Sequence, residues 1–168
     1  ISSTGTSLSL SNDGNNLVIG IPESTRTIDG TQSTGSAKIY KFSGNSWSQH
    51  GQELLGDDHF GKYTSITSNG SKVAIGSDKN SVVQVYDDVN SLSDWTLRST
   101  ITVSGATIDM GDLRLTDSGD RLFVMSGDEK VRVYDSTHTQ ETIKGDVRSF
   151  SITKEGSSMV LTSDTGLT

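Results

Sequence analysis

A fourfold internal repeat constrains this chain more than any other feature of its sequence. Short polar turns, each with one glycine, recur at spacings of 56, 49 and 37 residues: Gly14, Gly70, Gly119 and Gly156. Two alternating positions, apolar in all cases except Thr64, precede each turn, and an unbroken apolar triplet follows it. The alternation predicts a half-buried strand, and the triplet predicts a strand covered on both faces. Each turn with its flanking segments is therefore expected to be a β-hairpin.

The remainder of each repeat predicts two more strands. A third strand is expected at 37–40, 83–86 and 131–134, and a weaker fourth near Trp47, near Trp95 and around 141–143. The fourth copy is expected to end after its second strand. We therefore predict one all-β repeat domain over residues 1–168. Its units lie approximately at 5–56, 57–105 and 106–145, with a partial unit at 146–168.

Such units must stack, because a four-stranded sheet cannot bury two apolar faces alone. Four antiparallel strands in about 40 to 50 residues have the size of a propeller blade. We expect β-propeller-type blades, about three and a half of them, in an incomplete or open ring. A flat stack of sheets would meet the same burial requirement and is the alternative fold.

The segment 60–76, which begins with Phe60-Gly61, resembles the FG-GAP-type repeat of integrin-like β-propellers. Residues 5–20 match the same pattern with Thr4 in place of the Phe, and the third unit has Met110-Gly111 there. The turn 11–14 is similar to the hairpin of TolB-like and WD40-like propellers. The resemblance implies a propeller used for binding. The family's calcium loop, Asp-x-Asp-x-Asp-Gly, is missing from every unit, so the resemblance implies no calcium site.

The predicted units do not close a ring, since propellers typically need about four to eight blades. Three arrangements are open. Further blades lie in residues outside this sequence, or a second copy completes the ring or extends an open array, or four units form a compact ring with one incomplete blade. The chain starts at Ile1 without an initiator Met or a signal peptide, which we interpret as a mature or cut fragment. Open blade faces and edges favour self-association.

Composition excludes several classes of function. The net charge is −7, so a nucleic-acid partner is not expected. No apolar run reaches the roughly 18 residues of a membrane helix, so membrane insertion is not expected either. The absence of Cys excludes disulfides and thiolate metal sites.

No catalytic signature is present. The three histidines, His50, His59 and His138, lie in different predicted units and outside any nucleophile or metalloprotease motif. We predict a protein that is not an enzyme and needs no cofactor.

The predicted loops carry many acidic residues, and the loops between second and third strands should share one face with the connections between units. We consider this face a candidate binding surface for a cation or a basic partner. The alternative is that these residues only solvate turns. The leading candidates are Glu23, Asp29, Asp57, Asp58, Asp78, Asp128 and Glu129, and Asp109, Asp146 and Asp164 lie in equivalent segments. Segment 23–37 is predicted to be an unusually long loop, functional or disordered.

Two further features have two interpretations each. Trp47 and Trp95 would suit a sugar-stacking platform, but their similar places in the repeat favour packing between blades. Asn69 begins an Asn-Gly-Ser glycosylation sequon, and Asn-Gly is also a preferred hairpin turn.

The leading hypothesis is a non-enzymatic, extracellular or surface-associated β-propeller repeat module for binding or adhesion. Its partner would be a protein or carbohydrate ligand. One alternative is a structural subunit that assembles with further copies of itself through open blade faces into a filament or ring. Another is a fragment of a propeller hydrolase.

Overall fold

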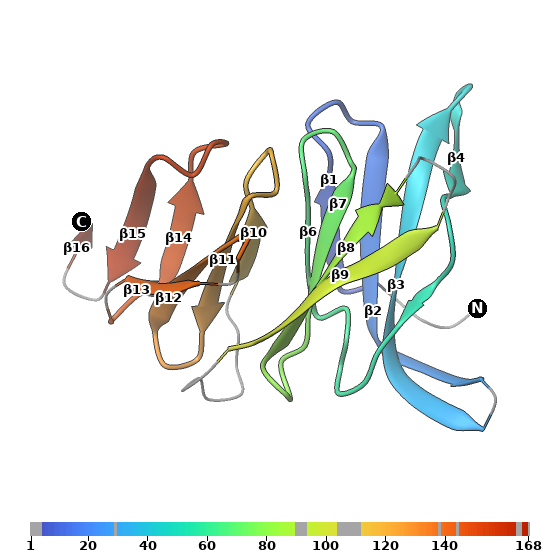
Figure 1. The fold of residues 1–168 in the computed structure, drawn as a ribbon, viewed down its shortest axis with the longest axis horizontal. Coiled ribbons are helices and arrows are strands. Elements are labelled where there is room, and N and C mark those ends of the chain that lie inside the picture. Colours follow the sequence, from blue (N-terminus) through green and yellow to red (C-terminus); the bar gives the residue numbers. More distant parts are fainter. Residues whose placement is uncertain are drawn as a thin grey trace.

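The computed structural model describes residues 5–28, 30–89, 94–103, 112–137, 139–143, 145–163 and 166–167. These residues form a series of separate antiparallel sheets, which we call blades 1 to 4 (Figure 1). Blade 1 contains β1 (Ser7–Leu10), β2 (Asn16–Ile28), β3 (Thr31–Ser43), β4 (Ser46–Gln49) and β5 (Leu54–Leu55). Blade 2 contains β6 (Tyr63–Ile66), β7 (Lys72–Gly76), β8 (Val82–Asp88) and β9 (Trp95–Thr102).

Blade 3 contains β10 (Asp112–Leu115), β11 (Arg121–Ser126), β12 (Lys130–Asp135) and β13 (Gln140–Ile143). Blade 4 contains β14 (Ser149–Ile152), β15 (Met159–Ser163) and β16 (Gly166–Leu167). Strands follow one another in chain order within each sheet, and β5 pairs with β3. The predicted all-β fold class is confirmed: the blades are small antiparallel sheets in an unclosed array. Within the described residues no helix is long and apolar enough to cross a membrane.

Each blade repeats one register between its first two strands. The equivalent pairs are Leu8↔Ile19, Thr64↔Ile75, Leu113↔Val124 and Phe150↔Leu161. Because paired side chains of a sheet share one face, these residues all point to the same side of their blades. We call this side, which faces the preceding blade, the leading face, and the opposite side the trailing face.

Three apolar cores lie between successive blades, each formed by a trailing face and the next leading face. Between blades 1 and 2, Val18, Ala37 and Ile39 of blade 1 pack against Ile75, Tyr86 and other residues of blade 2. Ala74 and Val83 pack in the same way against Leu113 of blade 3. The third core joins blade 3 to Phe150 and Leu161 of blade 4. The apolar triplets of the sequence are therefore the second strands, and those of blades 2 and 3 are covered on both sides. In blade 4 the middle residue of the triplet, Val160, is 50% exposed.

The blades curve about an axis that runs close to the first hairpin turns, which lie at one end of the blades (Figure 1). The N–H of Asn12 donates to Ser68 O (3.1 Å), that of Ser68 to Asp117 O (3.3 Å), and that of Asp117 to Lys154 O (2.8 Å). Lys154 Nζ in turn donates to Asn12 Oδ1 (3.0 Å). A straight row with about 5 Å per step would separate the outer turns by about 15 Å, beyond a lysine's reach. The curvature is that of partial propeller blades and not of a flat stack.

Each first hairpin is closed by a side-chain hydroxyl that the sequence analysis did not recognise, buried in blades 1 to 3 and exposed in blade 4. The residue three positions before the turn glycine is Ser11, Thr67, Thr116 or Thr153. Its side-chain oxygen accepts a bond from the backbone N–H five residues on, at Asn16, Lys72, Arg121 or Ser158. Its carbonyl accepts the N–H of the glycine, which has a positive φ in all four turns. A Ser or Thr at this position therefore gives the first hairpin of every blade the same turn geometry.

Replacing Thr67 with Val is expected to lower the free energy of unfolding by about 2 kcal/mol. The backbone N–H of Lys72 donates a hydrogen bond to Thr67 Oγ1 at 3.0 Å. Thr67 is 1% exposed, so in the Val variant this N–H would have neither the hydroxyl nor water as a partner. Thr153→Val is the matched control, because Thr153 is exposed and water can replace its hydroxyl. Urea denaturation of both variants measures the difference, and equal losses would refute the role of burial.

The prediction of a 15-residue loop at 23–37 is wrong. β2 and β3 continue through this segment as a ribbon that projects beyond the body of blade 1 (Figure 1). The register shifts between Ile21 and Thr25, and Ser24 Oγ donates to Ser36 Oγ at 2.8 Å in the buried part of the ribbon. Its threonines are β-branched and favour an extended backbone, so the segment forms strands despite its polar composition. Blade 4 also differs from expectation, because β16 begins a third strand there.

Candidate binding site between blades 1 and 2

The linker between β5 and β6, residues 56–62, lies against the base of the β2–β3 ribbon. The N–H of Gly56 donates to Gly35 O (3.2 Å), and the N–H of His59 donates to Thr34 O (2.9 Å). Gly35 and Phe60 form a parallel bridge. The linker is therefore held against the ribbon by backbone hydrogen bonds and one isolated bridge.

The Phe-Gly dipeptide anchors this linker. Phe60 is 3% exposed and lies in the core between blades 1 and 2, where its ring contacts that of Tyr86 edge-on at 6.5 Å. Gly61 has φ +95°, and a Cβ there would overlap the carbonyl oxygen of Ser36. The Phe joins the two blades, and the Gly lets the backbones approach closely.

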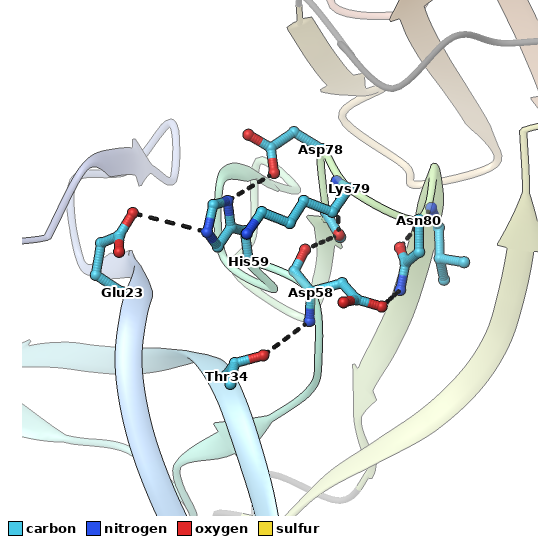
Figure 2. A network of polar contacts seen from close by, with 9 residues as sticks. Glu23, Thr34, Asp58, His59, Asp78, Lys79 and Asn80 are labelled. Carbon is cyan, nitrogen blue, oxygen red and sulfur yellow. Dashed lines mark hydrogen bonds and ion pairs between the residues drawn. The ribbon is translucent and has the colours of Figure 1, made fainter.

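Two consecutive residues of the linker, Asp58 and His59, have left-handed backbone conformations, with φ of 55° and 66°. Non-glycine residues adopt this conformation at a cost of about 1 kcal/mol or more each. Here it is imposed from three sides (Figure 2). Thr34 Oγ1 accepts the N–H of Asp58 at 3.0 Å, Ser77 Oγ donates to the carbonyl of Asp58, and Asn80 Nδ2 donates to Asp58 Oδ2 at 3.4 Å.

The imidazole of His59 lies between two carboxylates from different blades (Figure 2). Its Nδ1 lies 3.0 Å from Asp78 Oδ1, in the β7–β8 turn, and its Nε2 lies 3.8 Å from Glu23 Oε1, on the ribbon. The Asp78 side chain is 17% exposed and that of Glu23 is 76% exposed. Asp78 thus orients the ring, while Glu23 stays largely free for contact with a ligand.

Glu23 and His59 line a polar pocket of about 210 Å³. Its walls come from the ribbon, the linker and the β7–β8 turn: Pro22, Glu23, Ser24, Thr25, Thr34, Asp58, His59 and Lys79. Carboxylates and hydroxyls accept hydrogen bonds, and acidic groups attract cations. The pocket is therefore suited to an ammonium, guanidinium or polyhydroxyl group.

The structure brings together three of the predicted acidic residues, Glu23, Asp58 and Asp78, around this pocket. Asp57 lies beside them on the linker, exposed. Asp29, Asp109 and Asp164 lie outside the described residues. His59 and Thr34, which hold the site together, were missed because their partners are 19 and 24 residues away in sequence.

Asp128 and Glu129 lie elsewhere, in the β11–β12 turn of blade 3, and are engaged in ion pairs. Asp128 accepts two bonds from the Arg132 guanidinium, at 2.8 and 2.7 Å. These bonds hold the pKa of the Asp128 carboxyl well below its usual range. Glu129 pairs with Arg148 at 2.5 Å. The predicted acidic residues thus lie in two separate clusters, one around His59 and one in which Arg132 and Arg148 pair with the carboxylates.

No three His, Cys, Asp or Glu side chains among the described residues are arranged to hold a metal ion. Asn69 is exposed in its turn, and its Oδ1 accepts bonds from the backbone N–H (3.0 Å) and hydroxyl (2.8 Å) of Ser71. Its glycosylation stays a prediction.

The two tryptophans occupy the same register position in their blades but different surroundings. Trp47 pairs with Phe42, which lies two residues after Tyr40. In the same way, Trp95 pairs with Asp88, two residues after Tyr86. Trp95 is 3% exposed, and its indole N–H donates to His50 O at 3.0 Å across the blade boundary. Trp47 is 43% exposed and contacts the ring of Phe42 at a tilt, with ring centroids 5.3 Å apart. They form no shared platform.

The chain is similar in fold to hydrazine synthase of Kuenenia stuttgartiensis, with a TM-score of 0.64 and 16% identity. The likeness covers 94% of this chain and 41% of that one, so this chain spans less than half its length. At this identity it shows the fold alone. Solved structures with a matching fold number 788 chains, so the fold does not select a function. No protein-family model matches the sequence, and no curated protein matches it.

Proposed function

We propose that the chain is a non-enzymatic binding module of propeller type, which takes a basic segment of a protein ligand in the pocket between blades 1 and 2. The strained linker carries this proposal. Asp58 and His59 are held in left-handed conformations by contacts from both blades. Such strain persists where the surroundings impose it, and it concentrates at functional sites.

Electrostatics favours a basic partner. Glu23 and Asp58 contribute two carboxylates to the pocket wall, against the single fixed positive charge of Lys79, and Asp78 adds a third carboxylate beside the His59 ring. The chain as a whole carries a net charge of −7, which would steer a cationic segment toward it. Because the pocket spans two blades, its geometry depends on a rigid scaffold and not on one flexible loop.

The resemblance of segment 60–76 to integrin-like FG-GAP repeats supports a role in adhesion and an extracellular or cell-surface location. The dipeptide Phe60-Gly61, which carries this resemblance, belongs to the same linker as Asp58 and His59. The residues that define the repeat thus also position the pocket.

A fluorescent oligolysine peptide, titrated by anisotropy, tests this function. We expect Glu23→Gln and Asp58→Asn each to weaken binding about 5- to 10-fold, the loss expected for one charge-assisted contact. Glu155→Gln is the control, because it removes the same charge from an exposed turn of blade 4. Equal losses in all three variants would mean general attraction to an acidic protein. Preferential binding of a neutral oligosaccharide would assign the pocket to a carbohydrate.

A further inference from the structure

The contacts of His59 fix which of its ring nitrogens carries a proton. Its Nδ1 lies 3.0 Å from Asp78 Oδ1, and an ionised carboxylate can only accept a hydrogen bond. Nδ1 is therefore the donor, which leaves Nε2 of the neutral imidazole as an acceptor. Nε2 faces Glu23 Oε1 at 3.8 Å, so two acceptors face each other across this gap (Figure 2).

Two kinds of positive group resolve this arrangement. A proton on Nε2 makes the imidazole a cation whose second N–H points toward the carboxylate of Glu23. A basic side chain of a ligand can instead donate to Nε2 and to Glu23 together, because an ammonium has three N–H donors and a guanidinium has five. Glu23 is 76% exposed, and both residues line the pocket, so a donor from solvent has access to them.

We propose that a proton and a basic side chain of the ligand compete for Nε2 of His59. The inference rests on the proposed function and adds His59 to the residues that contact the ligand. A proton on Nε2 removes the acceptor and sets a positive charge beside the bound cation. Binding of the ligand therefore releases that proton to solvent, and by reciprocity a lower pH weakens binding.

Every element packed around the imidazole carries charged residues. They are Glu23 and Arg26 on the ribbon, Asp57, Asp58 and Lys62 on the linker, and Asp78 and Lys79 in the β7–β8 turn. Arg26 lies 3.6 Å from Glu53, which does not line the pocket. The carboxylates therefore outnumber the lysines around the ring. This excess of negative charge favours one added positive charge, carried either by a proton or by the ligand.

Imidazoles are the side chains whose charge changes between about pH 5 and 8, since carboxyl and lysine side chains ordinarily titrate below and above this range. Among the described residues, His59 is the histidine that lines the pocket. His50 also lies at the boundary between blades 1 and 2, but its side chain is 10% exposed and its Nε2 lies 2.9 Å from Asp88. His138 lies outside the described residues. A pH dependence that arises in the pocket is therefore assigned to His59.

Anisotropy titrations with fluorescent oligolysine at about pH 8 and about pH 5, at one ionic strength, test the inference. Lysine stays charged at both pH values, so the ligand itself does not change. We expect the dissociation constant of the parent chain to be about 5-fold higher at the lower pH, which is the effect of one like charge about 4 Å away in a solvated site.

The variant His59→Asn removes the titrating group and keeps the local contacts. The amide nitrogen of Asn takes the place of Nδ1 and can donate to Asp78, and Asn tolerates the left-handed backbone of this position, with φ 66°. Its dissociation constants at the two pH values should be equal. His138→Asn is the matched control, because it removes an imidazole from the segment between β12 and β13 of blade 3 and should keep the parent's ratio. Far-ultraviolet circular dichroism at both pH values checks that each variant is folded.

Calorimetry gives a second readout, of the released proton itself. At about pH 6.5, where a histidine side chain is ordinarily half protonated, the apparent binding enthalpy of the parent should vary with the ionisation enthalpy of the buffer, and that of His59→Asn should not. Equal affinity of the parent at both pH values, or a pH dependence that persists in His59→Asn, would overturn this inference alone. If oligolysine failed to bind the parent at the higher pH, the proposed function would be wrong, and this inference with it.

Discussion

Replacing Gly61 with Ala is expected to lower the free energy of unfolding by about 3 kcal/mol or more. Two costs combine at this position. The backbone φ is +95°, where a side chain is strained, and the new Cβ would overlap the carbonyl oxygen of Ser36. Because that oxygen belongs to the β3 backbone, it cannot move away without opening the contact between the linker and blade 1. Urea denaturation followed by circular dichroism measures the loss.

Gly145→Ala is the matched control, since no atom lies within 4 Å of a Cβ there and its φ is not positive. It should change stability by less than about 0.5 kcal/mol. If Gly61→Ala were as mild, the linker would not be held against β3 in solution. In that case the pocket between blades 1 and 2 would lose its wall, and the proposed ligand site would be wrong as well.

Replacing Asp128 with Asn is expected to cost about 3 kcal/mol at neutral pH. The Arg132 side chain is 5% exposed, so its guanidinium would remain charged and buried with one of its two acceptor oxygens replaced by a donor. Removing one partner of a buried ion pair leaves the other without compensation. Glu129→Gln is the control, because Glu129 and Arg148 form an exposed pair whose loss should cost well under 1 kcal/mol.

The loss should depend on pH in one direction. Hydrogen bonds from Arg132 lower the pKa of Asp128 in the folded state, relative to about 3.9 in the unfolded chain. The carboxylate therefore stabilises the fold fully above that unfolded pKa, and the stabilisation is lost as the pH falls toward the folded pKa. Denaturation midpoints of the parent chain and Asp128→Asn should differ most at neutral pH and converge below about pH 4. A difference that is constant with pH would refute the ion-pair explanation.

Local patterns of the sequence were sufficient for the hairpins. Alternation before each turn and an apolar triplet after it predict strands such as β6 and β7, and the structure has them there. The glycine of each turn has a positive φ in the structure, 73° at Gly70, as tight hairpin turns require. The loop prediction for segment 23–37 was wrong for a local reason too, because its polar composition was given more weight than the preference of its threonines for extended backbone.

The candidate site was only partly visible in the sequence. Acidic residues in loops were identified by composition, but composition cannot separate Glu23, which is open to solvent, from Asp128, which Arg132 neutralises. His59 carries no motif, and its importance arises only from contacts with Asp78 and Glu23 across a blade boundary. Such contacts depend on how the blades pack, which no spacing of residues encodes directly.

By itself, the sequence determined the repeat, the strand pairing within each blade and the all-β class, because these follow from periodicity and turn chemistry over a few residues. Only the tertiary structure decided which apolar faces are buried and which side chains meet. Trp47 and Trp95 show the reason: both occupy the same place in the repeat, yet one is exposed and one is buried. Burial depends on whether another blade lies alongside, and this is a property of the assembled array.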